Sequence, residues 1–488
     1  MPPFDIVIRG ARIVTASDLF VADLGLRGET IAAIGRDLPA GDREIEATGY
    51  IVTPGGVDAH CHIEQLTATG LMNADSFETA TRAAAQGGTT TVVPFAAQHP
   101  GTSLEKVVAD YHEAAARGAI VDYAFHMIVT DPRPEILNRE LPPLVRAGHA
   151  SLKAFMTYDR LRVEDEKLLD IIWAARRHGC MVCIHAENHG MISWTSRRLL
   201  ERGYKAPRYH VVSHPRLGEA EAVYRAITFA TFLDQPIMLF HLSTREAVEI
   251  VHRARGEGRK IFAETCTQYL LLDAADLDRP GIEGAMWMCS PPLRDAEDRE
   301  ALWRGLENGT LQLVSSDHAP YRMDETGKLA RGPDPSFKEI ANGLPGIELR
   351  LPLLFDAMVS SGRMDLRRFV ELTATAPARI YNLHPKKGTI AVGADADLVL
   401  WDPSLEVTIA QGPRHDNAGY TPYAGRRVRG WPVMVLRRGE VIVEKGELRA
   451  MPGSGRFLPR TGGEAAKPTG RLAPELDPGR NFGAVLTD

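Results

Sequence analysis

Cysteine and runs of like charge are both scarce in this sequence of 488 residues. Five cysteines are too few for a disulfide framework in a chain of this length, and their odd number is typical of a reducing compartment. The net charge is −6, and no block of about five like charges marks a segment that binds nucleic acid or a membrane surface. We therefore expect neither nucleic acid nor a membrane as a partner.

Long apolar segments are missing too. Residues 1–5 have neither the basic region nor the apolar region of a signal peptide. No uninterrupted apolar run approaches the ~18 residues that a membrane-spanning helix needs. These absences predict a cytoplasmic protein. Hydrophobic residues make up 44% of the sequence, which is ample for a large buried core.

Strand-like runs occur at both ends of the chain and suggest one small domain built from both. They are residues 5–9, 11–14, 23–27 and 30–34, and again 396–401, 433–436 and 440–443. Such short apolar runs with turn residues between them are typical of a β-sandwich.

The middle of the chain alternates strand-like runs with helical ones, such as residues 165–178. Eight strand-like runs can be counted: 51–53, 89–93, 123–129, 151–155, 181–185, 236–241, 260–264 and 311–316. This alternation is typical of a parallel sheet covered by helices and favours an α/β protein with a closed (β/α)8 TIM barrel. A doubly wound open sheet is the alternative.

The predicted organisation is a β-sandwich part at 1–52, the barrel at 53–385, a second β-sandwich part at 386–450 and an extended tail at 451–488. The tail is rich in glycine, proline and charge and shows little periodicity. We interpret it as either disordered or lying on a neighbouring subunit.

Histidines near the ends of the predicted strands are the main sign of chemistry. His60 and His62 follow the first run, and residues two apart on a strand face the same way, so both can bind one metal ion. His185 and His241 each close a later apolar run. Each alone is as well explained as a packed core residue. Their recurrence at the strand ends where barrel active sites are built favours a metal centre.

Two charged residues complete this set. Lys153 lies inside an apolar run, where burial favours the neutral amine; the alternative is a lysine whose charged end reaches solvent. Asp317 ends the last run, as an acid–base group or as the cap of a following helix. Together the six residues resemble the binuclear form of the amidohydrolase superfamily.

Six sequence blocks, in order, resemble the D-hydantoinase and dihydropyrimidinase family of that superfamily. They are 55–62 (GGVDAHCH), 151–158 (SLKAFMTY), 264–270 (ETCTQYL), 289–294 (CSPPLR), 316–320 (SDHAP) and 342–348 (NGLPGIE). The resemblance extends over roughly residues 5–445 and is specific, because several blocks contain no residue with a role in metal binding.

The resemblance implies a hydrolase that opens a hydantoin, a dihydropyrimidine or a related cyclic amide to an N-carbamoyl amino acid or an analogous product, by attack of a hydroxide held between two metal ions. It implies that carbon dioxide forms a carbamate on Lys153, which bridges two zinc or manganese ions, and that the subunits form homotetramers. It also implies that Ser290 and Asn342 fix the substrate.

The assignment gives each residue a role. His60, His62, Lys153 and Asp317 bind one ion, and Lys153, His185 and His241 bind the other. Asp317 takes the proton of the hydroxide and delivers it to the leaving nitrogen, while Tyr158 donates a hydrogen bond to the developing oxyanion.

Relatives with other functions are the alternatives. Dihydroorotases have an arginine two residues after the second histidine, where this chain has Glu64; allantoinase is the other enzyme alternative. Collapsin-response-mediator proteins resemble this fold without its metal ligands and act as binding proteins. All six ligand positions are filled here, which argues against a binding protein.

Glu64 is also a candidate for substrate selection. If strand alternation persists past His62, Glu64 faces the substrate and disfavours apolar side groups on it, because burying an unpaired carboxylate is costly. The alternative is that the chain turns away after His62 and that Glu64 pairs with an arginine at the rim.

Overall fold

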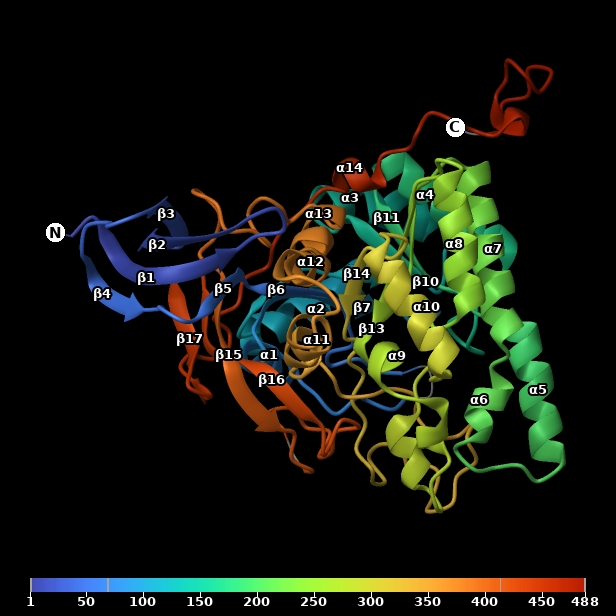
Figure 1. The fold of residues 1–488 in the computed structure, drawn as a ribbon. Helices are drawn as coiled ribbons and strands as arrows, with labels where there is room; N and C mark the ends of the chain where they lie inside the picture. Colours follow the sequence, from blue (N-terminus) through green and yellow to red (C-terminus); the bar gives the residue numbers. More distant parts are fainter. Residues whose placement is uncertain (1, 68–69, 413, 487–488) are drawn as a thin grey trace.

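A barrel of eight parallel strands forms the centre of the molecule (Figure 1). The structure is a computed structural model that describes residues 2–67, 70–412 and 414–486. The strands follow one another around the barrel in chain order, and the short β8 (Asp122–Tyr123) pairs with β7. The barrel strands are β6 (Gly56–Cys61), β7 (Thr89–Ala97), β9 (His126–Ile128), β10 (Ser151–Phe155), β11 (Met181–His185), β12 (Ile237–Leu239), β13 (Ile261–Cys266) and β14 (Leu313–Ser315).

The ring closes between its first and last strands. The N–H of His62 donates to the carbonyl of His318 (2.7 Å), and the N–H of Asp317 donates to the carbonyl of His60 (2.9 Å). Behind this seam, the wholly buried guanidinium of Arg350 lies 3.8 Å from the carboxylate of Asp58. Closure therefore brings His60 of β6 and His62, which directly follows β6, beside Asp317.

Helices surround the barrel, and α4 (Asp165–His178) has the bounds that the sequence predicts. In chain order the others are α1 (Phe77–Gln86), α2 (Leu104–Gly118), α3 (Leu141–Arg146), α5 (His189–Glu201), α6 (Tyr209–Ser213), α7 (Arg216–Phe232), α8 (Arg245–Gly256), α9 (Thr267–Leu271), α10 (Ala296–Glu307), α11 (Arg350–Leu354), α12 (Leu366–Val370), α13 (Ala376–Ile380) and α14 (Gly463–Ala466). None of the described helices is long and apolar enough to cross a membrane.

Side chains alternate along the barrel strands between the interior and the surrounding helices. Phe155 on β10 and Cys183 on β11 belong to the cluster that fills the interior. Lys153 and His185 lie two residues from them on the same strands, so they share the inward direction. The period of two thus brings a lysine and a histidine into the barrel.

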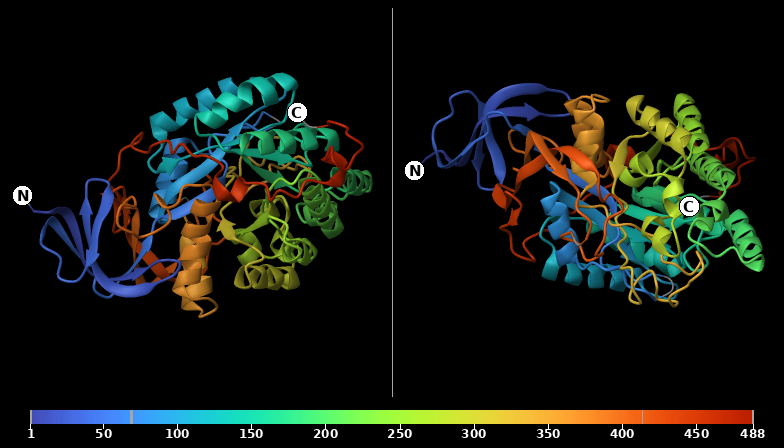
Figure 2. Two further views of the ribbon diagram at one scale, coloured as in Figure 1. Left: turned by 90° about the horizontal axis from the view of Figure 1, so that it is seen from above. Right: turned by 60° about the horizontal axis from the view of Figure 1, so that its bottom comes forward.

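The second sheet contains strands from both ends of the chain, as the sequence predicts, and these ends lie together in both views of Figure 2. Its strands are β1 (Phe4–Val14), β2 (Leu19–Arg27), β3 (Thr30–Gly35), β4 (Gly41–Glu46), β5 (Ile51–Pro54), β15 (Leu398–Thr408), β16 (Arg427–Arg437), β17 (Glu440–Glu444) and β18 (Glu447–Leu448). Side chains from both ends, such as Ile13 and Leu400, share one apolar core.

The run at residues 51–53 belongs to this second sheet. It forms β5, which lies between β1 and β15, so its prediction as the first barrel strand is wrong. The first barrel strand is β6, which begins after the break at Gly55. Burial misled the prediction, because β5 and β6 are both wholly buried and their apolar character does not tell one sheet from the other.

The tail between Gly455 and Arg471 packs on its own barrel, which corrects the prediction of a disordered tail for this part. The last described residues, 478–486, are mostly exposed, and a contact of the tail with a neighbouring subunit stays a prediction. Gly455 and Leu458 donate backbone hydrogen bonds to the carbonyls of Ala119 and Tyr123. Arg460 is buried and donates to the carbonyl of Phe125 (2.7 Å). The left view of Figure 2 shows this red segment crossing the barrel.

Candidate metal centre

Two histidines and an aspartate converge at the seam of the barrel. The Nε2 atom of His60 lies 3.1 Å from Oδ1 of Asp317, and the Nε2 atom of His62 lies 3.3 Å from the same oxygen. Burial disfavours ionisation of Asp317, yet the nearby imidazoles of His60 and His62 outweigh it and hold the pKa of this carboxyl well below its ordinary value. The carboxylate is therefore ionised, as a metal ligand must be.

The other nitrogen of each of these imidazoles is held from behind. The Nδ1 atom of His60 lies 2.5 Å from the carboxylate of Glu264, and the Nδ1 atom of His62 lies 2.7 Å from Oε1 of Gln65. Metal-binding histidines are oriented in this way by an acceptor on the far nitrogen. Both rings thus present Nε2 toward Asp317.

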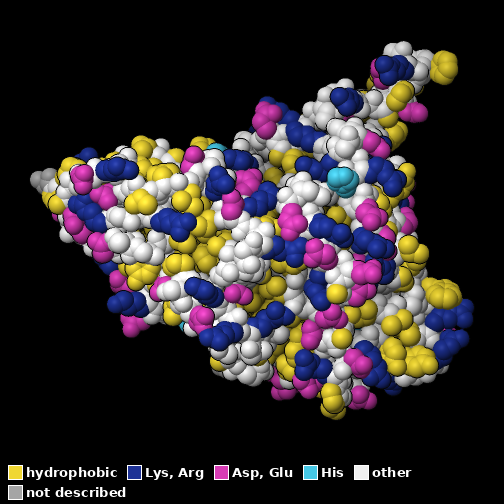
Figure 3. All heavy atoms as spheres, in the orientation of Figure 1, with side chains coloured by type: hydrophobic (Ala, Val, Ile, Leu, Met, Phe, Trp, Pro, Cys, Tyr) yellow, Lys and Arg dark blue, Asp and Glu magenta, His cyan; other side chains and the backbone are white. Residues whose placement is uncertain are grey.

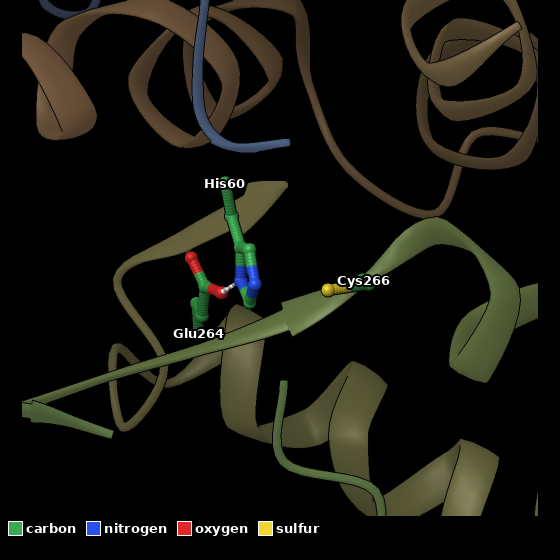
Figure 4. Close-up of side chains that lie close together, drawn as sticks. All are labelled: His60, Glu264 and Cys266. Atoms are coloured by element: carbon green, nitrogen blue, oxygen red, sulfur yellow. Dashed lines mark hydrogen bonds and ion pairs between the residues drawn. The ribbon is translucent and has the colours of Figure 1, made fainter. Parts of the chain in front are cut away.

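Cys266 lies beside this pair, and its sulfur is within 4.8 Å of the ligand atoms of His60 and Glu264 (Figure 4). Burial raises the pKa of the Cys266 thiol well above its ordinary value. A protonated thiol is a poor metal ligand. We therefore interpret Glu264 as the partner of His60 and not as part of a second metal group.

A second cluster lies across the barrel interior. The rings of His185 and His241 are 4.4 Å apart, and the ring of His241 is 5.3 Å from that of His60. The carboxyl group of Glu187 is hydrogen-bonded to Nε2 of His185 (2.7 Å). Nδ1 is therefore the nitrogen of that ring that is available to bind a metal ion. Burial lowers the pKa of His185 and of His241 well below the ordinary value, so both imidazoles are neutral.

Lys153 interacts electrostatically with Asp317, His185 and His241, and its amine has no hydrogen-bond partner among the described residues. The Nζ atom is buried, unpaired and 4.1 Å from the ring centre of Phe240. Burial lowers the pKa of Lys153 to about 8. The amine is thus far more often neutral near pH 7 than the amine of an exposed lysine.

The residues present fit two metal ions. Four neutral or metal-oriented imidazoles and one carboxylate line the barrel mouth. Two buried nitrogens, Nζ of Lys153 and Nδ1 of His241, have no partner in the part of the chain that the structure describes. Buried polar atoms are rarely left without a partner in native proteins unless a ligand satisfies them. These side chains offer nitrogen and oxygen atoms, which are ligand types that zinc and manganese bind.

Three of the candidate residues have left-handed backbone conformations. The φ angles are 47° at Asp317, 43° at His241 and 76° at Tyr158. Residues other than glycine seldom adopt this region, and such strain gathers at functional sites. Asp317 and His241 each lie two residues past the end of a barrel strand, β14 and β12, so the left-handed turns fall at the mouth of the barrel.

Tyr158, Ser290 and Asn342 lie on loops at the same end. The ring of Tyr158 is 5.1 Å from that of His185, and a hydrogen bond joins Tyr158 to Ser290. Burial raises the pKa of Tyr158 well above its ordinary value, so the phenol stays protonated and can donate. Oδ1 of Asn342 is buried and has no partner within residues 2–67, 70–412 and 414–486.

Glu64 does not continue the alternation of β6. Its φ is 49°, so the chain turns there. One carboxylate oxygen accepts from the N–H of Phe77 at the start of α1 (3.2 Å), and the other lies 3.9 Å from Arg117. This is the alternative arrangement, in which Glu64 pairs with an arginine at the rim, and the expectation that it faces the substrate is corrected.

Glu264 and Glu187, the partners of His60 and His185, are not among the site residues predicted from sequence. Each is a buried acid at the end of a barrel strand. Burial raises the pKa of Glu187 to about 8. The signal that singled out Lys153, a charged residue in or directly after an apolar run, applies equally to both acids and would have found them.

Comparison with known proteins places the chain in a family. Residues 51–442 match the model of the amidohydrolase family. The chain is 42% identical to the D-hydantoinase of Ralstonia pickettii over 93% of this chain and 99% of that protein. A solved structure of a D-hydantoinase has a TM-score of 0.91 at 42% identity, covering 94% of this chain and 99% of that one. For the dihydropyrimidinase of Brevibacillus agri the TM-score is 0.90 at 40% identity, covering 94% and 99%.

A closed parallel barrel with this set of donors at its mouth is the architecture of a metal-dependent hydrolase. The chain belongs to the amidohydrolase family, and within it to the group of the D-hydantoinases and dihydropyrimidinases. These relatives do not favour the alternatives of a dihydroorotase, an allantoinase or a binding protein.

Proposed function

We propose that this protein opens the ring of a cyclic amide, a hydantoin or a dihydropyrimidine, to give an N-carbamoyl amino acid. The observation that carries the proposal is the convergence of Nε2 of His60 and His62 on one oxygen of Asp317, at 3.1 and 3.3 Å. The names of the relatives, D-hydantoinase and dihydropyrimidinase, support the substrate class.

We propose two divalent ions at this site, zinc or manganese. His60, His62 and Asp317 hold one and His185 and His241 the other, with Lys153 between them. When bound, such ions lower the pKa of a water toward about 7 and polarise the carbonyl that is attacked. The two unpaired buried nitrogens, on Lys153 and His241, support this assignment.

Lys153 is proposed to carry a carbamate. Its neutral amine adds to the carbon of carbon dioxide and loses one proton, which converts a buried amine into the carboxylate ligand that two ions can share. The burial of Nζ, its lack of a partner and the pKa of about 8 support this step. Without carboxylation, a protonated Lys153 would repel both ions.

Asp317 and Tyr158 have separate roles in the proposed reaction. The ionised Asp317 accepts the proton of the attacking water and delivers it to the leaving ring nitrogen. The protonated phenol of Tyr158 donates a hydrogen bond to the oxygen on which negative charge develops. Ser290 and Asn342 hold the rest of the ring, and the buried, unpaired Oδ1 of Asn342 supports that role.

The assembly and layout of the chain are proposed as well. We propose domains at 1–52 with 386–450, at 53–385 and at 451–488, and a cytoplasmic location, which the five free cysteines support. A homotetramer is supported by exposed apolar side chains on and beside α5–α7, among them Trp194, Leu217 and Tyr224. Figure 3 shows apolar side chains gathered over the corner of the molecule that α5 occupies, and light scattering in solution tests the assembly.

The proposed function is tested with the purified protein loaded with zinc or with manganese. Hydantoin, benzylhydantoin, dihydrouracil, allantoin and dihydroorotate are each followed for ring opening, and metal content is measured on the same sample. We expect turnover of hydantoins or dihydrouracil and about two ions per chain. Metal-loaded protein that opens none of these rings would refute the proposal, and preference for allantoin or dihydroorotate would reassign the substrate.

A further inference from the structure

A second buried lysine, Lys328, lies outside the metal ligands. Its side chain is wholly buried, in the long loop between Asp317 and Asn342. Among the described residues no carboxylate lies within ion-pair distance of it. Lysine is almost never fully buried without a counter-ion, because desolvating the charge is costly. A methionine fills similar space at less cost, so the hydrogen-bond donors of Lys328 call for an explanation.

Those donors face two backbone carbonyls. The Nζ atom of Lys328 donates to the carbonyl of Ala341 (2.8 Å) and to the carbonyl of Met288 (3.3 Å). Ala341 directly precedes Asn342, and Met288 lies two residues before Ser290. The single ammonium group therefore joins the two segments that carry the proposed substrate contacts.

Both segments are loops, so no helix or sheet sets the distance between them. Other contacts hold each segment. His210 donates to the carbonyl of Cys289 (2.8 Å), and the hydroxyl of Tyr269 donates to the carbonyl of Pro291 (2.7 Å). The N–H of Gly343 crosses to the carbonyl of Met288 (2.9 Å). Among the described residues, Lys328 is the side chain that bonds to both segments.

These bonds hold the backbone on both sides of the two residues proposed to contact the substrate. The carbonyls on both sides of Ser290 are bonded, at Cys289 and at Pro291. Asn342 is flanked in the same way, by the bonded carbonyl of Ala341 and the bonded N–H of Gly343. The contacts thus fix the backbone on both sides of Ser290, whose hydroxyl contacts Tyr158 and His210 (3.3 Å), and of Asn342, whose buried Oδ1 has no partner among the described residues.

The burial of Lys328 makes the neutral form of its amine accessible near pH 7, and the amine keeps its N–H groups in that form. Burial lowers the pKa of Lys328 to about 7. Either protonation state carries at least two N–H groups, enough for both carbonyls. The bridge therefore does not need the charge, and it persists across neutral pH.

We propose that Lys328 is a positioning residue that sets the separation of Ser290 and Asn342 and so the affinity for the cyclic amide ring. The inference rests on the proposed function, because it needs those two residues to hold the substrate. It assigns Lys328 no part in the metal centre or in proton transfer. Loss of the bridge should let the two loops move apart and weaken binding while the chemical step stays intact.

The test compares Lys328→Met, which keeps the bulk and removes the donors, with Lys328→Gln, which keeps an N–H donor on a shorter side chain. Lys167→Met on the exposed surface of α4 is the matched control for loss of a lysine. For each holoenzyme we measure kcat and KM with hydantoin or dihydrouracil, metal content, thermal stability and, by calorimetry, the Kd of the N-carbamoyl product.

We expect Lys328→Met to raise KM and the product Kd by about 10–100 fold, with kcat within a few fold and metal content unchanged. The KM and Kd of Lys328→Gln should lie between those of this variant and the wild type, and those of Lys167→Met should match the wild type.

Unchanged KM and Kd overturn the inference, whether or not thermal stability falls, because Lys328 then only supports the fold. Lost metal or a lowered kcat alone also overturns it. If Lys328→Met does not fold, Lys328→Gln decides by the same criteria. A wild-type protein that opens no ring overturns the proposed function, and this inference with it.

Discussion

Glu264→Gln tests whether metal affinity depends on the carboxylate behind His60. Glu264 is wholly buried and has two partners, Nδ1 of His60 at 2.5 Å and the hydroxyl of Ser315, which donates to it at 2.6 Å. Glutamine has the same shape, but it has no charge and only one carbonyl oxygen. The NH₂ group of the glutamine must therefore face either the ring N–H of His60 or the hydroxyl of Ser315, which donates a hydrogen bond in the wild type. In the variant at least one of the two hydrogen bonds that Glu264 accepts is lost or reversed.

We expect the affinity for the metal beside His60 to fall roughly 10–100 fold, the range for the outer partner of a ligating histidine, or about 1.4–2.8 kcal/mol. Activity at limiting metal should fall in parallel and recover in excess zinc, because the loss is one of binding. Competition against a chromophoric chelator measures the affinity, and elemental analysis measures the occupancy. Glu113→Gln, which removes a 75% exposed carboxylate on α2, is the control.

Wild-type metal affinity in Glu264→Gln would refute this reasoning. Activity that falls while both ions stay bound would give Glu264 a role in the chemical step. Loss of metal by Glu113→Gln as well would show that net charge, and not the contact with His60, controls affinity.

Four other substitutions or conditions test separate parts of the structure. Because burial lowers the pKa of Lys153 to about 8, reactivation of metal-free enzyme by zinc at a fixed concentration of dissolved carbon dioxide should be about tenfold faster at pH 7 than at pH 6 and level off above pH 8; a flat profile contradicts the carbamate. Tyr158→Phe should lower kcat by about 10²–10³ fold with little change in KM, whereas a pure KM effect makes Tyr158 a binding residue. Lys387→Met removes the amine that lies 2.7–2.9 Å from the carboxylates of Asp122, Asp395 and Asp397 and leaves Arg438, 3.5 Å from Asp122, as the cation beside them among the described residues. Urea unfolding should show a loss of about 3–5 kcal/mol that shrinks as falling pH protonates them; full stability at pH 7 would argue against the charge cluster. Glu64→Leu should leave the ratio of kcat/KM for benzylhydantoin to that for dihydrouracil within about twofold, and a shift of tenfold or more would return Glu64 to the pocket.

The alternation of strand-like and helical runs predicted the barrel, and metal-binding residue types in or near the ends of the strand-like runs predicted the members of the metal set. His60 and His62 share a face because they are two residues apart, and Lys153 and His185 share the inward parity of their neighbours on β10 and β11. These are local properties, so the sequence contains them. Their roles as ligands stay a prediction.

Other features depend on contacts that a local pattern does not record. β5 and β6 are both buried, and the assignment of β5 to the second sheet follows from its pairing with β15, far along the chain. The tail is polar, but Arg460 is buried because carbonyl and hydroxyl acceptors at the barrel base accept its N–H groups. Glu64 turns away because the start of α1 offers an N–H to its carboxylate.

The choice of ligand atom is the feature least visible in sequence. A histidine can bind metal through either ring nitrogen, and the partner of the other nitrogen decides which one is presented. Glu264 is 204 residues from His60 in sequence and fixes Nε2 as its donor, whereas Glu187, two residues from His185, leaves Nδ1 as the donor of that ring. Loss of such a partner does not delete a ligand; it lets the ring turn and offer the wrong nitrogen. Variants of the partners should therefore still bind metal, only more weakly, while variants of the histidines should lose it.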